Sequence, residues 1–275
     1  DSRFKLINQE NQGQSAARNN GVSVSTGEYI TFVDSDDVIS SKYVEILNRY
    51  MTEEIDLVEC EYRAVRSVFN KLSQEENIQI VFEGNSEESI IESCNYGLSY
   101  SPVVKLYRRS LLENFPFLNG VIFEDIYHGV GTLKFIRKMV KIDYVGYHYR
   151  ERPNSTMHRK FSEKNLDVFI SSDKLVELFS SDKKLLPYIG KFLVQIVTTH
   201  HNYFTEKINP YQSMYDEKLK QYVAIVEESP EVARSSKMIR MYKLAPSLYL
   251  RYTFPFVYKT WGRLKHLKAL VIKGE

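Results

Sequence analysis

The first 160 residues alternate between two hydrophobic periods. Short runs of β-branched and aromatic residues have the length of buried strands, and the segments between them carry apolar residues at helical spacing. The predicted strands are residues 4–7, 29–33, 55–60, 78–82, 103–107 and 141–149. The predicted helices are residues 15–23, 42–51, 86–96 and 126–138, with Ser15 capping the first. This alternation predicts an α/β domain with a mostly parallel sheet flanked by helices.

From about residue 161 onward the pattern becomes wholly helical. Residues 166–180, 185–204 and 215–227 each repeat apolar positions every three or four residues. We therefore expect two parts, an α/β domain over residues 1–160 and a helical C-terminal region over residues 161–275.

The composition is that of an ordinary globular protein, with 43% hydrophobic and 26% charged residues. Two cysteines, Cys60 and Cys94, supply neither a disulfide framework nor the spacing of a metal site, which favours a reducing compartment. The residues given contain neither a charged-then-apolar leader nor an apolar stretch long enough to span a bilayer. These features predict a cytoplasmic location.

The C-terminal tail is basic and aromatic. From Ser236 onward nine Lys and Arg residues face one acid, Glu275, a net charge of +8 in a chain whose total is +2. Apolar residues recur at helical spacing, at Val257, Trp261, Leu264, Leu267 and Val271. This pattern predicts an amphipathic helix on an anionic membrane surface, with packing on the body or a dimer contact as alternatives. The tail forms no RNA-binding motif, so no nucleic-acid partner is expected.

An acidic cluster, Asp34-Ser35-Asp36-Asp37, follows the strand predicted at 29–33. Asp34 and Asp36 are two residues apart, so in an extended backbone their carboxylates point the same way. Mg²⁺ or Mn²⁺ is commonly held by one or two carboxylates together with phosphate oxygens and water. The cluster therefore predicts a metal and nucleotide-diphosphate site. A turn that leads into a helix capped by Asp37 or Ser40 is the structural alternative.

Several motifs surround this cluster. Upstream lie Asn8-Gln9-Glu10-Asn11-Gln12-Gly13, Ala16-Ala17-Arg18-Asn19-Asn20-Gly21 and Gly27-Glu28-Tyr29-Ile30; downstream lie Lys105-Leu106-Tyr107-Arg108-Arg109, Phe123-Glu124-Asp125-Ile126 and Tyr147–Ser155. In order and spacing these motifs resemble family 2 glycosyltransferases, over about residues 1–160. The resemblance implies the GT-A fold, a Rossmann-like domain. Family members carry a strand–helix–strand unit before the point where this sequence starts, so we expect the GT-A domain to be N-terminally incomplete.

The resemblance also implies roles for single residues. Arg18 matches an arginine that contacts the nucleotide, and Asp125 lies at the family's distance beyond the metal motif, where a general base takes the acceptor proton. The alternatives are a surface Arg paired with an acid, and an acid favoured in the first turn of a helix.

The basic segment after residue 147 adds further candidates. Arg150 and Arg152 are expected to close over the diphosphate, and His158 or His148 to add a metal ligand. A packing or surface role is the alternative for each histidine.

Together these features predict an inverting, metal-dependent glycosyltransferase. It would move a sugar from a nucleotide-diphosphate donor, expected to be a UDP-sugar, to a hydroxyl of a bacterial cell-surface glycan or a lipid-linked acceptor. Such an enzyme would be cytoplasmic, or peripheral on the inner face of the cell membrane. The alternatives are a non-catalytic GT-A-like binding or scaffolding protein, an inactive fragment, and a nucleotidyltransferase. No feature of the sequence specifies an oligomeric state.

Overall fold

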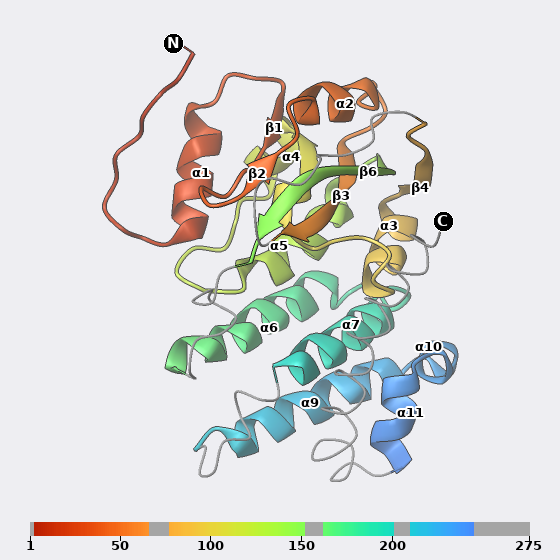
Figure 1. The fold of residues 1–275 in the computed structure, drawn as a ribbon. Coiled ribbons are helices and arrows are strands. Elements are labelled where there is room, and N and C mark those ends of the chain that lie inside the picture. Colours follow the sequence, from red (N-terminus) through yellow and green to blue (C-terminus); the bar gives the residue numbers. More distant parts are fainter. Residues whose placement is uncertain (1–2, 66–76, 152–161, 201–209, 245–275) are drawn as a thin grey trace. The chain divides into compact units, whose positions relative to one another are not determined.

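A computed structural model of the chain describes residues 3–65, 77–151, 162–200 and 210–244 (Figure 1). The chain divides into two compact units, Asp1–Leu185 and Leu186–Glu275. The predicted boundary after residue 160 therefore falls inside the first unit. The cause is helix α6 (Asp167–Phe179), which packs against α5 (Glu124–Gly131) in the first unit.

One six-stranded sheet forms the centre of the first unit (Figure 1). Its neighbours follow the order β1-β5-β3-β6-β2, and β4 also pairs with β6. The strands are β1 (Tyr29–Thr31), β2 (Val38–Ile39), β3 (Leu57–Val65), β4 (Ile80–Asn85), β5 (Lys105–Arg108) and β6 (Lys138–Arg150).

The sheet is mixed, so the prediction of a mostly parallel sheet is wrong. Only the β3–β6 pairing is parallel among the described strands, and the other four pairings are antiparallel. Alternation with helices fixes strand direction only when each connection is a simple crossover. Between β3 and β5 the connection contains a further strand and helix, β4 and α3, so β5 runs opposite to β3. The broader α/β class is confirmed.

The helices of the first unit are α1 (Gln14–Val24), α2 (Tyr43–Arg49), α3 (Ser86–Cys94), α4 (Arg109–Asn114), α5 and α6. Helices α1, α2, α3 and α6 match predicted segments to within about two residues, whereas the helix predicted over 126–138 ends at Gly131, because a 3₁₀ turn follows and β6 begins at Lys138. Short 3₁₀ turns lie at Pro102–Val104, Thr132–Phe135 and Glu163–Leu166. Helix α3 has a capping box, in which Asn85 Oδ1 accepts the Glu88 backbone N–H and the Glu88 carboxylate accepts the Asn85 N–H.

Three local predictions at the N-terminal side are wrong. Residues 4–7 lie in irregular backbone, with Phe4 84% and Leu6 88% exposed, because they pair with no strand among the described residues. Ser15 is buried in the first turn of α1, and the cap is Gly13. Neither Asp37 nor Ser40 caps α2, because the backbone after Asp37 first forms β2 and the helix begins only at Tyr43.

The hydrophobic core of this unit lies between α2 and the sheet. Tyr43, Ile46 and Leu47 are fully buried against Val58 of β3 and Ile142 of β6. The hydroxyl of Tyr43 donates to the Val103 carbonyl at 2.8 Å, so the polar end of this buried ring is satisfied. This packing fixes β6 and its partner β2. The acidic cluster lies in the segment just before β2.

The second unit is helical, as predicted. Its described helices are α7 (Leu186–Thr199), α9 (Gln212–Glu227), α10 (Pro230–Ser235) and α11 (Lys237–Leu244). Helices α7 and α9 pack closely at Gly190, where a Cβ atom would lie 2.8 Å from Ile225 Cγ2. The amphipathic helix predicted over residues 257–271 lies outside the described residues. Within the described part of the chain, every helix is too short or too polar to cross a membrane.

Candidate functional site

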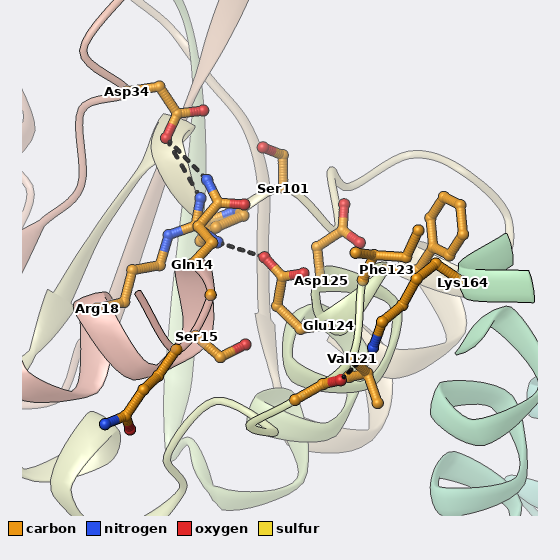
Figure 2. Close-up of a pocket in the computed structure, with 15 residues that line it drawn as sticks. Gln14, Ser15, Arg18, Asp34, Ser101, Val121, Phe123, Glu124, Asp125 and Lys164 are labelled. Atoms are coloured by element: carbon orange, nitrogen blue, oxygen red, sulfur yellow. Dashed lines mark hydrogen bonds and ion pairs between the residues drawn. The ribbon is translucent and has the colours of Figure 1, made fainter. Parts of the chain in front are cut away.

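An open cavity of about 510 Å³ lies in the first unit, beside the end of β1 (Figure 2). Helix α1 contributes Gln14 and Arg18, the segment after β1 contributes Asp34, and the start of α5 contributes Glu124 and Asp125. The cavity therefore brings together three of the predicted site residues, Arg18, Asp34 and Asp125. Asp125 is about 90 or more positions from the other two in the sequence.

Arg18 links the two walls of this cavity. Its Nη1 donates to Glu124 Oε1 at 2.7 Å, and its Nη2 donates to Asp34 Oδ1 at 3.3 Å. The guanidinium also lies over the rings of Phe117 and Phe32, 5.3 and 5.9 Å from their centroids. The Arg18 side chain is only 9% exposed. Arg18 is therefore a cavity residue that acids and aromatic rings hold in place, and the alternative of a surface arginine does not describe it.

Gln14 and Glu124 were not predicted as site residues. Gln14 lies one turn before Arg18 on the same face of α1, and its amide nitrogen lies 3.3 Å from Asp34 Oδ1. With the amide rotated by half a turn, its oxygen accepts from Arg18 Nη2 at 2.6 Å and its nitrogen donates to Glu124 at 3.2 Å. The four-residue spacing between Gln14 and Arg18 could have indicated Gln14 as a site residue. Glu124 could not be found in this way, because its pairing with Arg18 is a tertiary contact.

The acidic cluster divides between the cavity and the sheet. Asp34 lines the cavity with its side chain 36% exposed, whereas Asp36 does not line it. Asp37 Oδ2 accepts the hydroxyl of Tyr147 at 2.7 Å, and its Oδ1 accepts the Arg150 backbone N–H at 2.8 Å. Asp37 therefore ties the cluster to β6.

Asp125 has the electrostatic environment of a proton acceptor. Burial, followed by the neighbouring charge of Glu124, raises its pKa to about 7, and the Arg18 guanidinium opposes this rise. Its Oδ1 accepts the Ile126 backbone N–H at 3.1 Å. The preceding residue, Phe123, has a left-handed backbone with φ of 66°, a conformation that costs energy for a residue other than glycine. This geometry aims the first turn of α5 at the cavity.

The far end of the cavity is less acidic. Lys164 lines it and donates to the Gly120 carbonyl at 3.1 Å, on the opposite side of Asp125 from Asp34 (Figure 2). Ser101 lines the wall between these ends. Asp125 thus lies between an end rich in carboxylates and an end that carries the Lys164 amine, which also lies 3.7 Å from Asp167 Oδ2.

The remaining candidates are not brought into the cavity. Arg150 is exposed at the end of β6 and does not line it, and Arg152 and His158 lie outside the described residues. His148 is buried on β6, beside Val38 of β2, and burial lowers its pKa.

Few side chains of the cavity could bind a metal ion. Among the residues that the structure describes, no three His, Cys, Asp or Glu side chains gather as a metal site. Of the two predicted metal ligands only Asp34 lines the cavity, so the structure does not bring Asp34 and Asp36 together there.

Comparisons with known proteins indicate the family to which the first part of the chain is similar. Residues 1–116 match Glycosyl transferase family 2. The chain is 34% identical to EpsH of Bacillus subtilis, named as a glycosyltransferase, over 58% of this chain and 48% of EpsH. It is 31% identical to the glycosyltransferase GlyG of Streptococcus pneumoniae, over 66% of this chain and 61% of GlyG. The chain thus spans about half the length of the curated relatives it matches. The matches confirm the predicted family and indicate the transferase class.

Proposed function

We propose, from the match of residues 1–116 to glycosyl transferase family 2, that the chain transfers a sugar from a nucleotide-diphosphate donor to a hydroxyl group. The observation that carries the proposal is the placement of Asp125, with a pKa of about 7, in the same cavity as Arg18 and Asp34. A general base works best when its pKa lies near the working pH.

The donor would occupy the end of the cavity formed by α1 and Asp34. Arg18 and Gln14 offer hydrogen-bond donors to phosphate or carbonyl oxygens, and a UDP-sugar is the donor that the family resemblance favours. Asp34 and Asp36 would hold a Mg²⁺ or Mn²⁺ ion. When bound, such an ion neutralises charge on the diphosphate leaving group.

The acceptor would lie between Asp125 and the far end of the cavity. Asp125 takes the proton of the acceptor hydroxyl while the oxygen of that hydroxyl bonds to the anomeric carbon of the donor sugar. The bond from that carbon to the diphosphate breaks, and the diphosphate leaves with the electron pair. Attack on the face opposite the leaving group inverts the anomeric configuration. The acceptor class is a cell-surface glycan or a lipid-linked glycan, the latter consistent with the basic, aromatic tail.

Calorimetric titration of UDP into this chain, with and without Mn²⁺, tests the donor and metal assignments. We expect Mn²⁺-dependent binding that is lost in Asp34→Ala and weakened in Asp36→Ala. A matched control is Asp143→Ala, an exposed Asp that accepts the Gln79 backbone N–H, away from the cavity. Mn²⁺-independent binding would contradict the metal assignment. Absence of UDP binding would contradict the donor assignment and favour a non-catalytic binding protein.

A further inference from the structure

Asn19 uses its side-chain amide to bind the backbone of a distant segment. Its Nδ2 donates to the Phe117 carbonyl at 2.9 Å, and its Oδ1 accepts the Phe117 N–H at 2.9 Å. The same Nδ2 lies 3.1 Å from Asn119 Oδ1. A primary amide that satisfies both backbone groups of one residue reproduces the pairing of a neighbouring strand. This pairing fixes α1 to the segment that leads into α5.

Phe117 is in turn the centre of a packed column. Its ring lies under the guanidinium of Arg18, 5.3 Å from centroid to Cζ, and stacks on the imidazole of His128 at 3.6 Å with an angle of 10°. Burial, with the charges of Lys105 and Arg18, lowers the pKa of His128 to about 3, so the imidazole stays neutral. The column therefore holds a single cation, Arg18, on its cavity side.

The two walls of the cavity are the two elements that Asn19 joins. Helix α1 carries Gln14 and Arg18, and the chain that follows Phe117 carries Glu124 and Asp125. The connecting loop contains two residues with left-handed backbone, Gly120 with φ of 80° and Phe123 with φ of 66°. Other contacts also hold this loop, since the Ile122 N–H donates to Asp167 Oδ2 at 2.9 Å and Lys164 donates to the Gly120 carbonyl at 3.1 Å. The pairing at Phe117 is the contact that connects the loop and α5 to α1.

We propose that Asn19 is a positioning residue that sets the gap between the donor-binding wall and the general base. This role rests on the proposed function, in which Arg18 contacts the donor and Asp125 takes the proton. Asn19 itself touches the Phe117 backbone and acts through Arg18 and α5. A change of about 1 Å in such a gap is enough to lower turnover strongly.

A double-mutant cycle on UDP affinity tests this role. We expect Asn19→Ala to weaken UDP binding in Mn²⁺ by about tenfold in the native background and by less than about twofold in Arg18→Gln, because Asn19 affects the donor only through the position of Arg18. Asn20→Ala is the matched control, since its amide donates to exposed Gln9 at 2.8 Å on the same helix, and it should leave affinity unchanged. Equal losses in both backgrounds would overturn the proposal.

A second cycle separates this proposal from the proposed function. The melting temperatures of Asn19→Ala, Glu124→Gln and the double variant require no ligand. Coupled walls predict that the double variant loses clearly less than the sum of the two single losses. Additive losses would overturn the positioning role of Asn19 even if UDP binds. Coupled losses in a chain that binds no UDP would support the positioning role of Asn19 and contradict only the donor assignment.

Discussion

The first unit contains two clusters of charged side chains that differ in how their charge is compensated. In the core cluster, Glu59 lies 3.6 Å from both Lys105 and Lys141, and the Lys141 amine lies 2.8 Å from Glu61. The Ser99 N–H donates to Glu59 at 2.9 Å. Two cations thus face two carboxylates. In the cavity, Arg18 contacts Asp34 and Glu124, and Asp125 adds a third carboxylate beside them.

The comparison separates a structural use of buried charge from a chemical one. The balanced core cluster holds the backbone of residues 97–99, where Lys141 donates to the Gly97 carbonyl at 2.8 Å and Lys105 donates to the Ser99 carbonyl. The α1 and α5 end of the cavity keeps more carboxylates than cations. Such an excess of carboxylates favours a proton on Asp125 and, in the proposed function, a divalent ion beside Asp34.

The largest effect is expected from removing the uncompensated carboxylate. Asp125→Asn keeps the shape of the side chain and removes its basicity, so turnover should fall by about 10²- to 10⁴-fold with UDP affinity retained. Steady-state transfer and calorimetry on the same preparation give both quantities. Full turnover in this variant would exclude Asp125 as the base and would remove the chemical half of the comparison.

The core cluster should respond in stability instead. Glu59→Gln leaves Lys105 buried without its counter-charge, so the free energy of unfolding should fall by about 3–5 kcal/mol. Replacing both groups, as Glu59→Leu with Lys105→Met, should restore most of that loss, because an apolar pair avoids the cost of burying charge. Urea unfolding measures each variant. Glu45→Gln is the control, since Glu45 is 58% exposed in its pair with Arg49 and should change stability by about 0.5 kcal/mol or less.

A smaller effect is expected at Arg18, the cation that contacts the carboxylates of the cavity. Arg18→Lys keeps the charge and loses the planar fork that reaches Glu124 and Asp34 together. UDP affinity should fall by roughly 10- to 150-fold, which corresponds to about 1.5–3 kcal/mol for a charged hydrogen bond. Calorimetric titration measures the change. Unchanged affinity would mean that Arg18 contacts only the side chains of the protein and does not contact UDP.

Sequence patterns predicted one side of this comparison better than the other. Arg18, Asp34 and Asp125 belong to local motifs, and the structure places all three in the cavity. The Arg18–Glu124 pair and the role of Asp37 at β6 join residues more than 100 positions apart, and hydrophobic periodicity carries no information about such contacts. Strand direction failed for the same reason, because antiparallel pairing of β5 with β3 is decided by the path of the whole connection. Lys105 was read as part of a motif, and its burial with Glu59 is visible only in the fold.

A further effect is expected on the pH dependence of stability at Asp125. The pKa of this group is raised from 3.8 to about 7 in the folded chain, so the folded state binds the proton more tightly than the unfolded state. The stability that this proton supplies is fully present below the unfolded pKa and is lost as pH rises through about 7. Asp125→Asn lacks this titration and should therefore gain stability relative to the native chain between pH 4 and pH 8. Melting temperatures of the two proteins across that range measure the difference, in which the titration of all other groups cancels. A difference that stays constant with pH would show that Asp125 is ionised as an ordinary carboxylate, and the cavity would then hold its three acids as the core holds Glu59, with their charge compensated.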